Sequence, residues 1–361
     1  MARKPILIMA GGTGGHIYPA LAVAAYLRTH DVPLLWLGTR RGLEARLVPE
    51  AGYPLLTITI SGLRGKNVAT LLLAPFKLLL ALWQSVVLMM RIRPAAVLGM
   101  GGFASGPGGV AAWLLRVPLL LHEQNAILGL TNRLLAPLAS CCLEAFPGTF
   151  DRAAAIHTGN PVRAAIAALA APRERLEHRA APLRLLVLGG SLGAATLNRM
   201  VPDALVQLAA DTRAGIAVWH QSGDQHYAET AARYGGKKID ARVEPYIDDM
   251  AAAYAWADLV VCRAGAMTIA ELAAAGLGAI LVPYPYAVDD HQTANAEFLR
   301  TAGAAVLIQE RELTPSRLAA LIGELGAARA RLMDMAIAAR QLARPDAAEQ
   351  VGGACMEAAY A

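Results

Sequence analysis

The chain has 361 residues, of which 56% are hydrophobic and 17% charged, with a formal net charge of +5. A chain of this length and composition is expected to form two packed domains, and it is too apolar to be intrinsically disordered. The mild basic excess suits phosphate or an anionic membrane face, whereas the lack of a Lys/Arg run argues against a nucleic-acid partner. The four cysteines lack metal-ligand spacing, so we expect a reducing compartment and no metal site.

The first predicted element is a strand over residues 5–10, which runs into a glycine-rich loop, residues 11–15, and an Ala-rich helix. Backbone N–H groups at such a helix start, together with the helix dipole, favour phosphate binding. His16 closes the loop, and the dipole disfavours its cation, so it is a candidate general base or phosphate contact; the alternative is a loop histidine bonded to the backbone. The loop begins a dinucleotide fingerprint, but Ile17 occupies the third small position, which leaves an NADP reductase as a minor alternative.

The most hydrophobic stretch is Val68–Met90, which has about the length of a membrane-spanning helix. Pro75, Lys77 and Gln84 interrupt it, which argues against a spanning helix. Because basic residues flank it, one interpretation is an amphipathic helix on an anionic membrane surface, and the other is a buried helix of the first domain. Both interpretations remain open at this point.

The strand predicted over residues 116–121 leads directly into four polar residues, which are His122, Glu123, Gln124 and Asn125. Polar side chains at the carboxyl end of a strand face the ligand in a doubly wound domain. Helix capping by Asn125 is the alternative, but capping needs only one such residue. We therefore interpret this segment as functional.

The second half of the chain repeats the pattern, with a strand over residues 183–188, a glycine loop over 189–193 and a helix. The charged, proline-flanked segment Ala171–Pro182 before it is predicted to be a linker or a domain edge. Continuous apolar strands that alternate with helices are typical of parallel sheets covered on both faces. We predict an α/β fold of two Rossmann-like, doubly wound parallel-sheet domains facing across a cleft.

Two polar clusters follow the later strands. Glu271 lies at the start of a helix, where it either binds ribose hydroxyls or forms a capping box with Thr268. His291, Gln292 and Asn295 suit sugar hydroxyls, and the alternative is a solvated helix start capped by one of the two preceding aspartates. No D-x-D motif is present, which argues against a metal that bridges a nucleotide sugar.

Six motifs together resemble the MurG family of glycosyltransferases, glycosyltransferase family 28. They are GGTGGHIYPALA (Gly11–Ala22), GGFASGPGG (Gly101–Gly109), HEQNAILGLTNR (His122–Arg133), GNPVR (Gly159–Arg163), GGSLGA (Gly189–Ala194) and YIDDMAAAYAWADLVVCRAGAMTIAELAAAG (Tyr246–Gly276). The resemblance implies the GT-B architecture and inverting transfer of GlcNAc from UDP-GlcNAc to the C4 hydroxyl of MurNAc in lipid I, which gives lipid II in peptidoglycan synthesis. It also implies that residues 1–160, with a C-terminal helix over 338–361, form the lipid I and membrane-associating domain, and that residues 161–337 bind UDP-GlcNAc.

The resemblance also assigns residues to the reaction. The catalytic base is implied to be His16 or Glu123, and the sequence does not choose between them. The implied donor-binding residues are Thr13, Gly14, Gly15, Asn125, Arg163, Ser191, Ile247, Ala266, Met267, Thr268, Glu271, His291, Gln292 and Asn295. The implied acceptor-binding residues are Phe103, Ser105, His122 and Asn132. Thr13, Gly14 and His16 are also implied to cradle the lipid diphosphate or to contact the reacting centre.

Within the donor set, the loop around Ser191 is implied to meet the diphosphate, Ile247 and Arg163 the uracil, Glu271 the ribose and Gln292 the GlcNAc hydroxyls. No cofactor and no divalent metal is implied, because UDP-GlcNAc is a substrate. The implied partners are UDP-GlcNAc, lipid I, the anionic membrane face through Val68–Met90, and cell-wall or division proteins. The implied location is peripheral, on the cytoplasmic face of the bacterial inner membrane.

Three residues depart from the family pattern. Phe103 replaces a frequent tyrosine, and Leu192 and His291 each replace a frequent glutamine. Two alternatives to lipid II synthesis remain: another UDP-sugar enzyme of the same fold, such as a lipid glycosyltransferase or a UDP-GlcNAc 2-epimerase, and a non-catalytic nucleotide-binding membrane scaffold.

Overall fold

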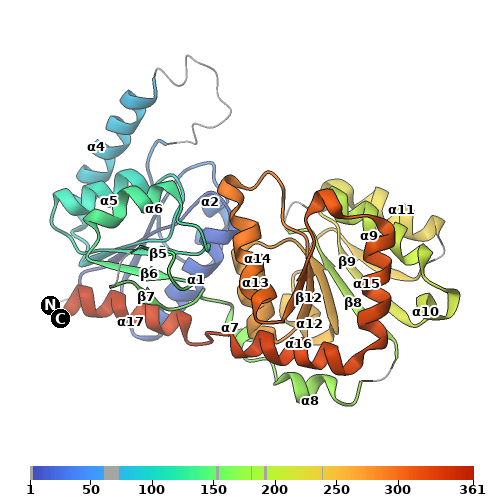
Figure 1. The fold of residues 1–361 in the computed structure, drawn as a ribbon. Coiled ribbons are helices and arrows are strands. Elements are labelled where there is room, and N and C mark those ends of the chain that lie inside the picture. Colours follow the sequence, from blue (N-terminus) through green and yellow to red (C-terminus); the bar gives the residue numbers. More distant parts are fainter. Residues whose placement is uncertain (1–2, 61–72, 152–153, 180, 191–192, 238) are drawn as a thin grey trace. The chain divides into compact units, whose positions relative to one another are not determined.

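The structure, a computed structural model, describes residues 3–60, 73–151, 154–179, 181–190, 193–237 and 239–361 (Figure 1). The chain divides into two compact units. The first consists of residues 1–163 and 344–361, and the second of residues 164–343.

The first unit is built on a parallel sheet with the strand order β3-β2-β1-β4-β5-β6-β7. Its strands are β1 (Ile6–Met9), β2 (Leu34–Gly38), β3 (Leu55–Thr57), β4 (Ala96–Gly99), β5 (Leu119–Glu123), β6 (Cys141–Glu144) and β7 (Ile156–His157). All four side chains of β1 are fully buried, two on each face of the sheet. Such burial on both faces explains the continuous apolar runs of the sequence and confirms the predicted parallel sheet.

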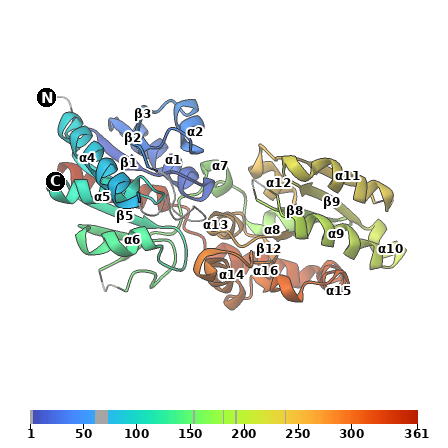
Figure 2. The ribbon, with the colours of Figure 1, turned by 90° about the horizontal axis from the view of Figure 1, so that it is seen from above.

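Helices cover both faces of this sheet. They are α1 (Gly14–Thr29), α2 (Glu44–Glu50), α4 (Ala74–Ile92), α5 (Ser105–Leu114), α6 (Leu130–Leu135) with the 3₁₀ turn η1 (Ala136–Leu138), and α17 (Ala347–Tyr360). Helix α17 brings the C-terminus back to this unit and packs along α1, where Val351 and Cys355 enter the core (Figure 1). The opposite face is covered by α4 and α5, which lie side by side (Figure 2).

Helix α4 contains the described part of the hydrophobic stretch, since residues 68–72 lie outside the described residues. Ala81, Ser85 and Met89 face the core of the unit. Most of its large apolar side chains face outward instead, and Phe76 and Trp83 are 70% and 63% exposed. The helix is long and apolar enough to cross a membrane, a weak criterion that core helices of soluble proteins also meet. The interpretation as a buried helix of the first domain therefore holds for one face of α4 only.

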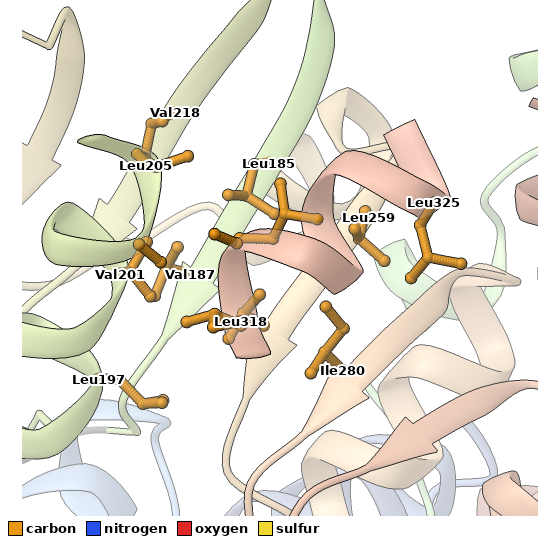
Figure 3. Packing of buried hydrophobic residues seen from close by; sticks show 14 of the residues in the cluster. Leu185, Val187, Leu197, Val201, Leu205, Val218, Leu259, Ile280, Leu318 and Leu325 are labelled. Carbon is orange, nitrogen blue, oxygen red and sulfur yellow. The ribbon is translucent and has the colours of Figure 1, made fainter. Parts of the chain in front are cut away.

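The second unit is built on another parallel sheet, with the order β10-β9-β8-β11-β12-β13. Its strands are β8 (Leu183–Leu188), β9 (Ile216–Gln221), β10 (Ala241–Glu244), β11 (Leu259–Cys262), β12 (Gly278–Leu281) and β13 (Ala305–Leu307). Its helices are α7 (Ala164–Ala167), α8 (Pro172–Leu176), α9 (Ala195–Gln207), α10 (Ala210–Ala214), α11 (Tyr227–Gly236), α12 (Met250–Trp256), α13 (Ala266–Ala275), α14 (His291–Thr301), α15 (Pro315–Ala327) and α16 (Arg329–Gln341), with the 3₁₀ turns η2 (Asp224–His226), η3 (Val288–Asp290) and η4 (Glu310–Glu312). Leucines of α15 and apolar residues of α9 pack on strands β8 and β11 to form the core of this unit (Figure 3).

The charged segment over residues 171–182 is part of the second unit. It contains α8, and Arg175 donates a hydrogen bond to the carbonyl oxygen of Gly276 at 3.0 Å. Arg179 forms an ion pair with the buried carboxylate of Asp258 at 2.9 Å. These contacts support the domain-edge interpretation of the segment, because its charges stabilise helix ends within the unit.

Candidate functional site

Each sheet has one topological switch point, where successive strands stop being added on one side of the first strand and begin to be added on its other side. This switch lies between β1 and β4 in the first unit and between β8 and β11 in the second. Loops that follow such neighbouring strands open side by side at the carboxyl edge, where ligands of doubly wound sheets bind. The glycine loops predicted over residues 11–15 and 189–193 follow β1 and β8, so each unit has one of them at its switch point, beside the loop that follows β4 or β11.

In the first unit, the loops after β1 and β4 are in direct contact. A Cβ atom on Gly102, whose φ is +91°, would lie 2.5 Å from the carbonyl oxygen of Gly11, so only glycine fits there. Ser105 is fully buried, and its hydroxyl donates to the carbonyl oxygens of Met9 and Gly101 at 3.1 and 2.8 Å. Ser105 therefore fastens one loop to the other. Its predicted contact with the acceptor stays a prediction.

His16 lies in the first turn of α1, half-buried between these two loops. Its Nδ1 lies 3.2 Å from the carbonyl oxygen of Gly11 and 3.4 Å from the Thr13 hydroxyl, and Gly101 packs against the ring. Because a carbonyl only accepts, Nδ1 carries the proton in the neutral ring and Nε2 is the basic nitrogen. Phe103, on the loop after β4, is 53% exposed.

Glu44 holds the first glycine loop through a hydrogen bond from Gly12 N. This role was not predicted from the sequence. Its carboxylate is fully buried and accepts hydrogen bonds from Gly12 N at 3.0 Å, Thr39 N at 2.9 Å and the Thr39 hydroxyl at 2.7 Å. Burial by itself raises the pKa of this carboxyl, but the hydrogen bonds from Gly12 and Thr39 outweigh it and lower the pKa. The signal in the sequence was an acid six residues after a strand that ends in glycine.

The four polar residues after Leu121 form a closed hydrogen-bonded cluster. Glu123 is 3% exposed, and its two oxygens accept from Asn125 N and Nδ2, Gly129 N and Asn132 Nδ2 at 2.9–3.2 Å. Helix α6 begins only at Leu130, so the capping alternative for Asn125 is wrong. The carboxylate instead shapes the loop between β5 and α6.

His122 belongs to the same cluster and is fully buried at the end of β5. Its Nε2 donates to the carbonyl oxygen of Gly159 at 3.0 Å, and its Nδ1 accepts from Gln124 Nε2 at 3.1 Å. Burial lowers the pKa of His122 to about 4, so the ring is neutral near pH 7. Asn132 is also buried, and its Nδ2 donates to the carbonyl oxygen of His122 at 3.1 Å.

In the second unit, the glycine loop after β8 leads into α9. Gly190 and Gly193 have φ angles of +82° and +77°, and a Cβ on Gly193 would lie 2.0 Å from the carbonyl oxygen of Ser222. The loop therefore requires glycine at position 193, and α9 begins two residues later. A glycine loop at a helix start is an arrangement that favours phosphate. The predicted contact of Ser191, like the departure at Leu192, lies outside the described residues.

Helix α13 follows β11 at the same edge. Ala266, Met267 and Thr268 form its first turn, and its N-cap is Gly265, which makes no side-chain cap. The capping-box alternative for Thr268 and Glu271 is therefore wrong, because Thr268 lies inside the helix. Glu271 is 9% exposed and accepts a hydrogen bond from the Tyr254 hydroxyl at 3.0 Å.

Helix α14 begins at His291, and its first turns approach the loop that precedes α13. Asn295 is fully buried and donates to the carbonyl oxygen of Ala264 at 3.2 Å. The side-chain oxygen of Gln292 accepts from Tyr284 N at 2.9 Å. Asn295 thus joins α14 to the loop before α13, and Gln292 joins it to the segment after β12. His291, Gln292 and Asn295 all lie in the first two turns of α14. His291 is half-buried at its start.

Two residues predicted at the uracil lie in different settings. Ile247 is 1% exposed, and its backbone N–H donates to the side-chain oxygen of Gln221 at 3.0 Å. Arg163 ends the N-terminal segment of the first unit, and its guanidinium carbon lies 5.8 Å from the ring centroid of Tyr18. Among the described residues, no group of three His, Cys, Asp or Glu side chains is placed to hold a metal ion.

Family models match both units. Residues 6–143 match the glycosyltransferase family 28 N-terminal domain, and residues 184–351 match its C-terminal domain. The chain is 59% identical over 355 residues to a protein of Nitrosococcus oceani named UDP-N-acetylglucosamine–N-acetylmuramyl-(pentapeptide) pyrophosphoryl-undecaprenol N-acetylglucosamine transferase, and 98% of each chain is covered. A protein of the same name from Alkalilimnicola ehrlichii is 54% identical, with 98% of this chain and 99% of that protein covered.

A solved structure gives the same result. The crystal structure of Acinetobacter baumannii MurG is 42% identical, covers 98% of this chain and 99% of its own, and superimposes with a TM-score of 0.86. The predicted resemblance and the two-domain GT-B fold are thereby confirmed. The chain belongs to glycosyltransferase family 28 and is a hexosyltransferase of that family.

Proposed function

We propose that this protein transfers GlcNAc from UDP-GlcNAc to the C4 hydroxyl of MurNAc in undecaprenyl-diphospho-MurNAc-pentapeptide, converting lipid I into lipid II. The observation that carries the proposal is a glycine loop at a helix start beside the switch point of each unit. Two diphosphates take part in this reaction, one in the donor and one in the lipid acceptor, and each unit offers one such loop. The names of the relatives agree with this reaction.

The donor is assigned to the second unit. The leaving diphosphate gains negative charge in the transition state, and the start of α9 offers fixed backbone N–H groups and the positive end of a helix dipole. The first turn of α13 lies at the same edge, and Glu271 in its second turn, which accepts a hydrogen bond from the Tyr254 hydroxyl, is assigned to the ribose hydroxyls. Gln292 and Asn295 of α14 are assigned to the sugar side. No cofactor and no resident metal enters the proposal.

The acceptor is assigned to the first unit, and His16 is proposed as the general base. Its Nδ1–H is directed to Gly11, which orients Nε2 as the proton acceptor for the attacking hydroxyl. Glu123 is the weaker candidate because four N–H groups already occupy its two oxygens. We assign Glu123 to the shaping of the acceptor loop together with His122 and Asn132.

The membrane contact is assigned to α4. Its outward apolar side chains include Phe76, Leu79 and Trp83, and the exposed cations Lys77 and Arg91 lie on the same helix. Apolar side chains enter the interface between headgroups and acyl chains while basic residues attract anionic lipid. This arrangement fits peripheral binding to the cytoplasmic face of the inner membrane, where a polyprenyl-linked acceptor resides.

The experiment that tests the reaction is transfer of labelled GlcNAc from UDP-GlcNAc to a lipid I analogue. His16→Ala is expected to lower kcat by roughly 10²–10⁴-fold, the usual contribution of a general base, without loss of UDP-GlcNAc binding. His30→Ala is the matched control, because His30 lies at the opposite end of the same helix. Glu123→Gln is expected mainly to lower thermal stability.

Each outcome decides one part of the proposal. If the wild type binds UDP-GlcNAc but transfers nothing to lipid I under any detergent condition, the lipid I assignment is wrong. If it transfers and His16→Ala keeps its kcat, only the base assignment is wrong. A fall in kcat for a stably folded Glu123→Gln would make Glu123 the base instead.

Membrane binding has its own test. Co-sedimentation with phosphatidylglycerol vesicles is expected for the wild type, and Phe76→Ser with Trp83→Ser is expected to weaken it at least about tenfold, because each buried aromatic contributes a kcal/mol or more. Tyr286→Ser is the control, since Tyr286 is an 81% exposed aromatic of the second unit. Equal binding of the two variants would contradict the assignment to α4.

A further inference from the structure

Gln221 is the last residue of β9 and connects two loops of the second unit. Its side chain is buried, with 5% exposed. Its Nε2 donates to the carbonyl oxygen of Gly190 at 3.0 Å, and its Oε1 accepts from the backbone N–H of Ile247 at 3.0 Å. One amide therefore joins the glycine loop before α9 to the segment that follows β10.

The backbone around Gln221 strengthens the same connection. Gly193 N also donates to the carbonyl oxygen of Gly190 at 3.0 Å, and Gly193 packs directly on the carbonyl group of Ser222. On the other side, Ser222 N donates to the carbonyl oxygen of Glu244 at 2.9 Å. The end of β9 thus lies between the two loops, and Gln221 supplies a side chain that reaches both.

We propose that Gln221 is a positioning residue that holds the diphosphate-binding loop and the uracil-binding segment at the spacing that one uridine diphosphate requires. This inference rests on the proposed function, which assigns the start of α9 to the diphosphate, and on the expectation from the family resemblance that Ile247 lies at the uracil. Gln221 is hydrogen-bonded to both loops. It binds one through a donor and the other through an acceptor.

The chemistry of the amide explains why this residue type suits the position. A glutamine offers an N–H donor and a C=O acceptor on one rigid plane, and the two loop groups are a carbonyl and an N–H. A carboxylate would place an oxygen against the Gly190 carbonyl, and an apolar side chain would satisfy neither group. Since the coupling acts between two subsites, its loss should matter most for a ligand that occupies both.

The experiment measures the affinities of the full-length protein for UDP and for uridine by calorimetry. Gln221→Met, which removes both hydrogen bonds and nearly keeps the volume, is expected to weaken UDP binding about tenfold, or about 1.4 kcal/mol. Uridine occupies one subsite only, so its affinity is expected to stay within about twofold, the range of a neutral substitution. The KM for UDP-GlcNAc should rise in parallel with the Kd for UDP.

Two further variants keep the test decisive. Gln207→Met makes the same chemical change on an exposed residue at the far end of α9 and should alter neither affinity. If Gln221→Met does not fold, Gln221→Ser takes its place, because it leaves room for water at both loop groups. Equal losses for uridine and UDP, or no loss for either, would overturn the inference.

The inference and the proposed function fail in different ways. Transfer by the wild type together with an unchanged ratio of the two affinities in Gln221→Met would refute only the positioning role. A changed ratio in a protein that transfers no GlcNAc to lipid I would support the positioning role and refute the proposed acceptor.

Discussion

Replacement of Glu44 by glutamine tests how the first glycine loop is held. The buried carboxylate accepts one hydrogen bond from Gly12 N through Oε2 and two from Thr39 through Oε1. Glutamine has the same shape but only one oxygen. If that oxygen serves Thr39, the amide group is a donor facing the Gly12 N–H, and this hydrogen bond is lost.

The expected cost follows from the type of hydrogen bond. A hydrogen bond to a charged group contributes about 1.5–3 kcal/mol, and the two bonds to Thr39 weaken when their acceptor becomes neutral. We therefore expect Glu44→Gln to lower the free energy of unfolding by about 2–3 kcal/mol. Because Gly12 precedes Thr13 and His16, the KM for lipid I should also rise, while UDP binding in the second unit stays unchanged.

Chemical denaturation and transfer kinetics check these two effects. Glu50→Gln is the matched control, because Glu50 ends the same helix, is 57% exposed and makes only a surface ion pair with Arg46 at 3.6 Å. Such pairs contribute at most about 1 kcal/mol. A free energy of unfolding of Glu44→Gln within about 0.5 kcal/mol of wild type would refute the reasoning.

Three further predictions concern other parts of the structure. Gly102→Ala should destabilise the first unit by several kcal/mol or prevent its folding, as seen by thermal denaturation, because its Cβ would lie 2.5 Å from the Gly11 carbonyl oxygen. Acidification should also destabilise this unit, because burial lowers the folded-state pKa of His122 to about 4. The contribution of neutral His122 to the free energy of unfolding is present above about pH 6.5 and decreases as the pH falls toward 4. The expected decrease between pH 7.5 and 5.5 is about 1 kcal/mol. Denaturation curves at these two pH values should show a smaller difference in His122→Asn, and an equal difference would contradict this cause. Tyr254→Phe removes the hydrogen bond from Tyr254 to Glu271 and should raise the KM for UDP-GlcNAc several-fold with little change in kcat; an unchanged KM would argue against a ribose role for Glu271.

The positions of the glycine loops can be read from the sequence, but the residues that hold these loops cannot. The apolar strands and their glycine turns predicted the two parallel sheets, because a strand buried on both faces must be apolar throughout, as β1 is. His16 was found because it closes a glycine loop. Glu44 and Gln221 were missed because each acts on a loop distant in sequence, Glu44 by 32 residues and Gln221 by 31 and 26.

Polar residues at strand ends show the same limit. From the sequence, Glu123 and His16 were equal candidates for the base, since both follow strands of the first unit. In the tertiary structure the oxygens of Glu123 meet four N–H groups, whereas the ring of His16 lies half-buried between two glycine loops. This difference is why we propose His16 as the base. The capping box of Thr268 and Glu271 had correct spacing but the wrong register, because α13 begins at Ala266.

Local patterns by themselves thus determined the fold class, the position of the glycine loops and the family, because strand periodicity and backbone conformation depend on neighbouring residues. The partner of each polar side chain was decided only in three dimensions. Helix α4 illustrates the reason: its composition suits a core or a membrane equally, and only the packing shows that Ala81 and Met89 face inward while Phe76 and Trp83 face solvent. The burial of a side chain depends on how the whole unit packs, so it cannot be predicted from one stretch of the sequence.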